Sequence, residues 1–312
     1  MTPGRAESVA KFAGGAVLVA SVAALLASLR NARPQSQRRG ERPRKPAVAA
    51  PLHVASGLLS LSVLLDSALE HYRGSFKNPG MAAPLLTSAA SVVGRGAAGV
   101  GRNMGRLRSG SAVSSVAVGS LGTAFHLYNI AKRPGGFGWL NLFYAAPPGA
   151  PAALALSGML GLTADRLAPA GGAGERQLLN LPPGPAIAAL SAGGMIGTMA
   201  EAALLHYRGA FQNPFMFVPV TLPPAAALLL SYAAFTRDER ASNLARIALL
   251  ATAAVGIAGV GFHAYGVSRS MGGWRNWSQN LLDGPPLPAP PAFTAFAIAG
   301  LTALNLLDEH RR

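Results

Sequence analysis

The chain has 312 residues, of which 50% are hydrophobic and only 12% are charged, and a typical soluble domain carries about twice that share of charge. The formal charge of +15 comes from Lys and Arg residues that lie between long apolar runs, which favours membrane topology over nucleic-acid binding. The absence of cysteine excludes disulfides, thiolate metal sites, iron–sulfur clusters and covalently attached c-type haem. The composition therefore predicts an integral membrane protein.

The N-terminal region is predicted to lie outside the main body of the protein. An apolar run at residues 8–29 is just long enough to cross a bilayer, so residues 1–29 are expected to form a transmembrane segment or signal anchor. Residues 30–47 are basic and contain several prolines. We expect them to form a disordered linker on the cytoplasmic side, where Lys and Arg are enriched.

Further apolar runs follow in two groups of four. The first group, within residues 48–168, covers about 48–70, 83–101, 111–131 and 148–166. The second group, within residues 183–308, covers about 183–205, 217–236, 244–266 and 288–307. Each run is predicted to form a membrane-spanning helix, and Pro and Gly gather in the segments between them.

A motif that occurs once in each group indicates an internal duplication. The pattern HYRG-x-F-x-NP-x-M runs from His71 and again from His206, and a second echo follows as FHLY around His126 and FHAY around His263. Matches in the same order at nearly constant spacing are typical of tandem repeats. Four spans per copy make the copies parallel. The predicted fold is therefore an all-α integral membrane protein with two tandem four-helix transmembrane repeats, related by a pseudo-two-fold axis along the membrane normal, plus one extra N-terminal span.

The distribution of Lys and Arg predicts the orientation. Most of the 27 basic residues fall in the linker, in the loops at 95–108, 166–176 and 237–246, and at the C-terminus, which are therefore expected on the inner side. This places the paired histidines toward the outer side of a membrane of the bacterial inner-membrane type.

The paired histidines are the first candidate site, because an intramembrane histidine is costly unless it is paired or liganded. They are His71, His126, His206 and His263. Two glycines precede the second histidine of each group on the same helix face, at Gly119 and Gly122 and at Gly256 and Gly259. Such a small-residue stripe could receive the edge of a flat cofactor while the imidazole binds its metal. Haem b is the best match, with Met81 and Met216 as alternative axial ligands.

The same stripes are equally what close helix packing in lipid requires without any cofactor. The imidazoles could likewise serve only as hydrogen-bonding groups at the headgroup boundary. The sequence leaves both interpretations open.

Two further pairs carry charge. Asp66 and Glu201 each lie five residues before the motif histidine and are candidates for a proton or ion path, or for locking helices together by binding Arg95. Arg73 follows Tyr72, and Arg208 follows Tyr207. These four residues are candidates for contact with an anion or a partner protein. The alternative for the arginines is snorkelling to lipid headgroups.

These features allow three functions. The first is a membrane subunit of an electron-transfer system that holds haem b or contacts quinone near the outer face and docks a redox partner protein there. The second is a transporter with a path between the two repeats. The third is a ligand-free membrane anchor or assembly protein. No residue is assigned a catalytic role, no nucleic-acid partner is expected, and the oligomeric state is left open.

Overall fold

The computed structural model describes residues 22–23, 48–99, 104–168 and 181–309. The expected N-terminal span at 1–29 lies outside these residues except at 22–23, and the linker at 30–47 lies outside them entirely. In the part of the chain that is described, every long element is an α-helix. This confirms the all-α class.

Eight long helices occupy the positions expected from the apolar runs. They are α2 (Ala49–Arg73), α3 (Ala83–Gly99), α4 (Gly105–Ala131), α6 (Gly149–Leu167), α7 (Pro183–Arg208), α8 (Val218–Thr236), α9 (Glu239–Arg269) and α11 (Pro291–Glu309). Two short helices, α5 (Trp139–Tyr144) and α10 (Trp277–Leu282), lie in the connections before α6 and α11. Three 3₁₀ turns complete the described elements: η1 (Pro79–Ala82), η2 (Pro214–Phe217) and η3 (Gly273–Asn276).

Five of these helices are long and apolar enough to cross a membrane. They are α2, α7, α9, α11 and the continuous stretch of η2 and α8. The protein is therefore a multi-pass integral membrane protein. Helices α3, α4 and α6 do not reach the same threshold of length and apolarity, because α3 has only 17 residues and α4 carries arginines and several serines. All eight predicted spans of this region are thus helices at the expected positions. Three of them, α3, α4 and α6, are not long and apolar enough to count as membrane spans.

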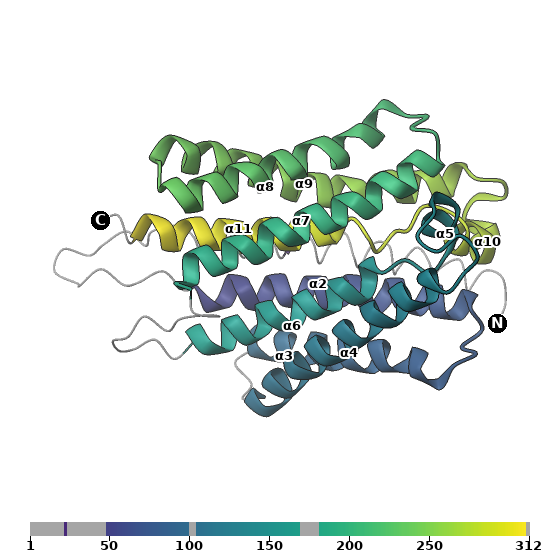
Figure 1. Cartoon of the computed structure of the whole chain (residues 1–312), viewed down its shortest axis with the longest axis horizontal. Coiled ribbons are helices and arrows are strands. Elements are labelled where there is room, and N and C mark those ends of the chain that lie inside the picture. Colours follow the sequence, from purple (N-terminus) through teal and green to yellow (C-terminus); the bar gives the residue numbers. More distant parts are fainter. Residues whose placement is uncertain (1–21, 24–47, 100–103, 169–180, 310–312) are drawn as a thin grey trace.

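The long helices pack as two four-helix bundles that lie side by side (Figure 1). We call α2, α3, α4 and α6 the first bundle, and α7, α8, α9 and α11 the second bundle. In each, successive helices are neighbours and the fourth closes the ring against the first. The bundles meet where α2 packs on α11 and α6 packs on α7. Helix α11 lies at the centre of this junction, and nearly all of its residues are buried.

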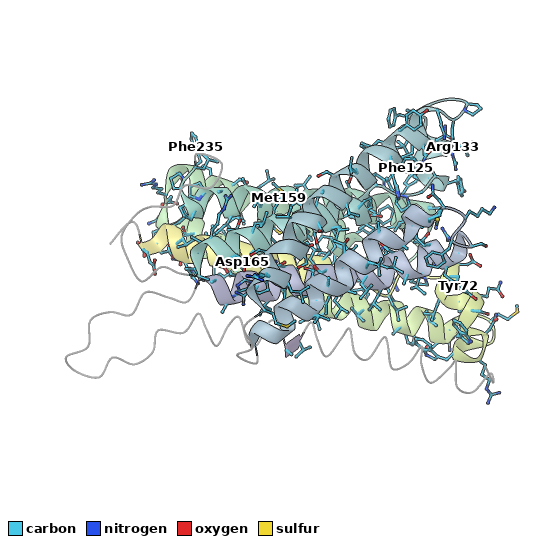
Figure 2. All side chains as sticks on the ribbon, turned by 90° about the horizontal axis from the view of Figure 1, so that it is seen from below. Tyr72, Phe125, Arg133, Met159, Asp165 and Phe235 are labelled. Atoms are coloured by element: carbon cyan, nitrogen blue, oxygen red, sulfur yellow. The ribbon has the colours of Figure 1, made fainter. Side chains whose placement is uncertain are left out.

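The two ends of the molecule carry different groups. We call the end that holds His71, His126, His206 and His263 the histidine end; α5 and α10 lie there (Figure 1). The opposite end, which we call the Asp165 end, holds Asp165 and Phe235, far from Tyr72 and Arg133 in Figure 2.

The interiors of the two bundles differ in polarity. In the first bundle Ser60 Oγ lies 3.0 Å from Ser91 Oγ and 3.2 Å from Ser157 Oγ, and all three serines are fully buried. In the second bundle large apolar side chains such as Met195 and Phe296 fill the interior.

The second bundle also has buried interhelical hydroxyl bonds. Ser191 Oγ donates to the carbonyl of Phe296 at 2.6 Å, and Thr294 Oγ1 donates to that of Ala253 at 2.9 Å. The bundles therefore share this means of holding helices together, and the polarity of their interiors differs in degree.

Glycines bring helices α4 and α6, and helices α9 and α11, into backbone contact. A Cβ at Gly119 would overlap the backbone of Pro151 and Ala155 in α6. A Cβ at Gly256 would likewise overlap α11 at Thr294. The small-residue stripes therefore allow the close helix approach that is common in membrane bundles.

The Gly119→Ala variant is expected to unfold more readily than the wild type, by about 1–3 kcal/mol, because the added methyl group forces α4 away from α6. The control is Gly197→Ala, since Gly197 lies in α7 and a Cβ there meets nothing within 4 Å. That change should be neutral or stabilise the helix by about 0.5–1 kcal/mol. Thermal unfolding in detergent measures both variants, and equal effects at the two positions would show that the crossing is not tight at Gly119.

Candidate functional site

The HYRG motif ends α2 and α7 with the same unusual backbone. Two successive non-glycine residues have positive φ, at 57° and 47° for Ser75 and Phe76 and at 57° and 45° for Ala210 and Phe211. Such residues cost about 1–3 kcal/mol each and persist only where surrounding contacts enforce them. The result is a sharp reversal that turns the chain back against the end of its own helix.

The motif histidine supplies one of these contacts. His71 Nδ1 lies 2.7 Å from the carbonyl oxygen of Met81, and His206 Nδ1 lies 2.8 Å from that of Met216. Because a carbonyl can only accept, each Nδ1 carries the hydrogen and donates it. The phenylalanine of the motif packs edge-on against the same imidazole in both copies, with ring centroids 6.1 Å and 6.0 Å apart.

The other motif residues complete the same turn. The side chain of Asn78 accepts a hydrogen bond from the backbone N–H of Gly80 and so caps η1, and Asn213 caps η2 in the same way. The motif glycine leaves room for the methionine, since a Cβ at Gly74 would lie 3.0 Å from Met81 Cε. Met216 Cε packs against Gly209 in the same way. Both methionines proposed as axial ligands are thus packed within their own turn.

The second pair of histidines holds the chain just before the last helix of each bundle. His126 Nδ1 donates to the carbonyl of Pro147 at 2.7 Å, and His263 Nδ1 donates to that of Pro286 at 2.8 Å. These hydrogen bonds fix the starts of α6 and α11. All four histidines therefore tether a loop through Nδ1, which leaves Nε2 as the nitrogen that carries the lone pair.

The four imidazoles meet only part of what a haem site needs. A tethered Nδ1 with a free Nε2 is the arrangement that orients a metal-ligating histidine, and His263 interacts electrostatically with His206. The glycine stripes, however, are filled by protein: Pro151 Cβ lies 3.0 Å from the Cβ position of Gly122, and Pro290 Cβ lies 2.8 Å from that of Gly259. They leave no groove for the edge of a macrocycle. Within the described ranges, no group of three or more His, Asp or Glu residues is placed to hold a metal ion.

The motif arginines join the two bundles reciprocally. Arg73 of the first bundle donates from Nη1 to the carbonyl of Leu282 in α10, at 3.2 Å. Arg208 of the second bundle donates from Nη1 to the carbonyl of Phe143 in α5, also at 3.2 Å. Each short helix thus docks on the first helix of the other bundle, and α10 also stays in contact with α9 of its own bundle. We call this pair of contacts the reciprocal clasp.

The motif tyrosines lie in these contacts. Tyr207 stacks on Phe143 with ring centroids 5.6 Å apart, and Phe143 stacks on Trp139 at 5.9 Å. Tyr72 and Arg73 line an open pocket of about 500 Å³ together with residues of α10 and the loop after it. Exposed aromatic rings are numerous at this end; they include Tyr72, Tyr128, Trp139, Tyr144, Tyr207 and Tyr265. Such a surface suits a membrane interface or a docked protein.

The two motif carboxylates lie near the junction of the bundles. Asp66 of α2 interacts electrostatically with Glu201 of α7 and with Glu70, and both Asp66 and Glu201 are partly buried. The carboxylate of Glu201 lies directly against Gly149 at the start of α6, where any Cβ would overlap it. Glu70 forms an ion pair with Arg73 at 2.8 Å. The structure thus brings acids from both bundles within electrostatic reach of one another.

A further cluster of charged side chains lies at the Asp165 end, and the sequence did not predict that these residues come together. Arg95 was considered as a partner for the motif acids, but its guanidinium instead meets Asp165 of α6, with Nη1 3.5 Å from Oδ2. Arg108 Nε lies 3.3 Å from Asp165 Oδ1, and Arg95 Nη1 lies 3.1 Å from His53 Nδ1. The signal in the sequence was the presence of Arg95 and Asp165 inside apolar runs, where an unpaired charge is costly.

Comparison of the chain with protein-family models, with curated proteins and with solved structures gives no match. The function is therefore inferred from the residues of this chain and their geometry.

The tether of His206 can be tested by two substitutions that differ in one hydrogen bond. His206→Ala leaves the carbonyl of Met216 without its donor and is expected to cost about 1–3 kcal/mol of stability. His206→Asn places an amide nitrogen close to the position of Nδ1 and should retain most of that stability, although it lacks Nε2. Thermal unfolding in detergent separates them. If the Asn variant unfolds as readily as the Ala variant, the Nδ1 hydrogen bond is not what His206 contributes.

Proposed function

We propose that the protein is a transporter that moves protons or a small cation past Asp66 and Glu201 at the junction of the bundles. The observation that carries this proposal is that the carboxylate of Glu201, from the second bundle, lies against Gly149 of the first bundle and within electrostatic reach of the acids of α2. Carboxylates within apolar helices are expensive and mark ion or proton pathways more often than structural contacts. A path between two moving halves is also the common arrangement in transporters built from repeats.

The two bundles resemble each other closely enough to be copies of one ancestral unit. We infer that the two bundles are tandem repeats related by an axis along the membrane normal. In support, both bundles have the same order of neighbouring helices, two histidine tethers and one positive-φ turn, and each contributes one arginine to the reciprocal clasp. The Lys and Arg distribution further supports a bacterial-type inner membrane with the histidine end outward.

Transport requires that the two bundles can move relative to each other at their junction. The contacts of the reciprocal clasp are exposed hydrogen bonds and a ring stack, which are weaker than buried packing, although Ser62 Oγ also donates a buried hydrogen bond to the carbonyl of Pro288 between the bundles. Glu201 lies against the start of α6 without a Cβ between them. A small rotation of one bundle against the other would therefore change the surroundings of both acids while each bundle remains intact.

Flux measurements in liposomes test the proposal. The protein is reconstituted with a pH-sensitive dye inside, a potassium diffusion potential is set with valinomycin, and the internal pH is followed with and without external sodium. We expect Asp66→Asn combined with Glu201→Gln to reduce flux to the level of protein-free liposomes. The control is Asp308→Asn, because Asp308 pairs with Arg246 at 2.9 Å in the last helix of the second bundle and is not part of this group of acids. Unchanged flux in the double variant would remove both acids from the pathway.

A second candidate function is a membrane subunit of an electron-transfer system that holds haem b or contacts quinone and docks a redox partner on the exposed aromatic surface of the histidine end. It is favoured by the four imidazoles whose Nε2 is available. Haem would supply one-electron chemistry, and the tethers would orient its axial ligands. The filled glycine stripes count against it.

Absorption spectra of protein from haem-replete cells, oxidised and dithionite-reduced, decide this second candidate. Haem bands that disappear in a variant with His71→Asn and His126→Asn would support it, because both changes keep a donor for the tether and remove Nε2. A colourless protein excludes it. A colourless protein without flux would leave the ligand-free anchor or assembly protein.

A further inference from the structure

The charged cluster at the Asp165 end has more positive than negative groups. It consists of the guanidiniums of Arg95 and Arg108, the carboxylate of Asp165 and the imidazole of His53, which come from α3, α4, α6 and α2. With a neutral imidazole, one positive charge is in excess. The carboxylate does not bind either arginine in the close bidentate geometry of a strong pair, since it lies 3.3 Å from Arg108 Nε and 3.5 Å from Arg95 Nη1. His53 Nε2 lies 3.7 Å from the same carboxylate.

Arg95 contributes a donor that lacks an acceptor. Arg95 Nε is buried and has no hydrogen-bond partner among the residues that the structure describes. Arg108 Nε and Asp165 Oδ1 lie 3.3 Å apart as an ion pair but not in hydrogen-bond geometry, so neither atom is satisfied. The side chain of Arg95 is only 3% exposed, whereas that of Arg108 is 23% exposed and lies at the rim. A buried charged donor without a partner destabilises the folded state. A negatively charged acceptor would satisfy Arg95 Nε and offset the excess positive charge.

The surrounding helices hold Arg95 in place. Its guanidinium lies against Gly161 of α6, where a Cβ would overlap it, and its Nη2 donates to the carbonyl of Arg108 at 3.3 Å. A Cβ at Gly57 of α2 would lie 3.3 Å from Arg95 Cβ. The arginine is thus fixed from three sides and is not a mobile surface charge.

The second bundle shows that this position does not need a charge for packing. Under the repeat proposed above, Leu230 and Leu304 correspond to Arg95 and Asp165, and both leucines are fully buried. Leu230 packs against Gly300, the counterpart of Gly161. Because replacing a buried ion pair by well-packed apolar residues is often neutral or stabilising, the charges of the first bundle are not explained by stability.

We propose that this cluster is a binding site for a small inorganic anion, held by Arg95 and Arg108 and reached past the Arg108 rim. Guanidinium groups recognise oxyanions such as phosphate and sulfate through paired N–H groups and also attract halides. The site lies at the opposite end of α2 from Asp66, so it is separate from the proposed pathway of protons or cations.

Anion-dependent unfolding tests the site. Purified full-length protein in a neutral detergent is heated at constant ionic strength in sodium gluconate, in which part of the salt is replaced by chloride, sulfate or inorganic phosphate. A bound anion stabilises the folded state by mass action, so at least one of these anions should raise the unfolding temperature by about 5 °C when present well above its Kd.

Two variants locate the effect. Arg95→Leu combined with Asp165→Leu recreates the leucine pair of the second bundle and should fold without responding to the anion. The control is Arg246→Leu, which removes an arginine of the second bundle that pairs with Asn305 and Asp308 at 2.9 Å; it should respond as the wild type does.

Three results would overturn the inference: a wild type that unfolds at the same temperature in all four salts, a double leucine variant that keeps the shift, or a shift produced only by added phosphatidylglycerol, which would assign the cluster to a lipid headgroup. The outcome is independent of the proposed function. The variant with Asp66→Asn and Glu201→Gln should still respond to the anion, whether or not it has lost flux.

Discussion

The hydrogen bond from a histidine Nδ1 to a loop carbonyl is the interaction on which the rest of the histidine end depends. It occurs four times, at distances between 2.7 Å and 2.8 Å. At His71 and His206 it fixes the reversal that follows α2 and α7, directly after the arginines of the reciprocal clasp. At His126 it fixes Pro147, two residues before Gly149, whose missing Cβ admits the carboxylate of Glu201 from the other bundle. Backbone groups near lipid must find such partners within the protein, which explains why a polar side chain is kept there.

The two bundles share this frame but differ inside. The second bundle is filled by apolar side chains such as Phe296 and Met195, whereas the first contains hydrogen-bonded serines and the buried guanidinium of Arg95. Apolar packing suffices to hold a bundle of this shape, so stability alone does not require the polar interior of the first bundle. We infer that the first bundle holds the groups of the proposed anion site, whereas each bundle contributes one acid, Asp66 or Glu201, to the proposed pathway.

Much of the frame could be predicted from the sequence, because helix positions depend on local apolar runs, and all eight long helices overlap them. The paired histidines and acids could be picked out from the sequence because the motif is repeated. The groups that they contact could not be predicted from the sequence. Whether Arg95 meets Asp66 or Asp165 depends on how α2, α3 and α6 are rotated about their axes, and small apolar residues give little periodicity from which to read that rotation. The docking of α5 and α10 on the opposite bundle is likewise a long-range contact between short elements. The glycine stripes were ambiguous because close helix packing and a cofactor groove require the same residues.

Chemical cross-linking across the reciprocal clasp tests the central claim most directly, because the chain has no cysteine of its own. Phe143→Cys and Tyr207→Cys are introduced together, since these rings stack 5.6 Å apart. A second variant carries Tyr207→Cys with Leu282→Cys, which pairs α7 with the short helix of its own bundle. A short bifunctional maleimide should link the first pair and leave the second unlinked, as judged by mass spectrometry of the digested protein. Efficient linkage of the second pair with none of the first would mean that the short helices do not dock on the opposite bundles, and the reciprocal clasp would not exist as described.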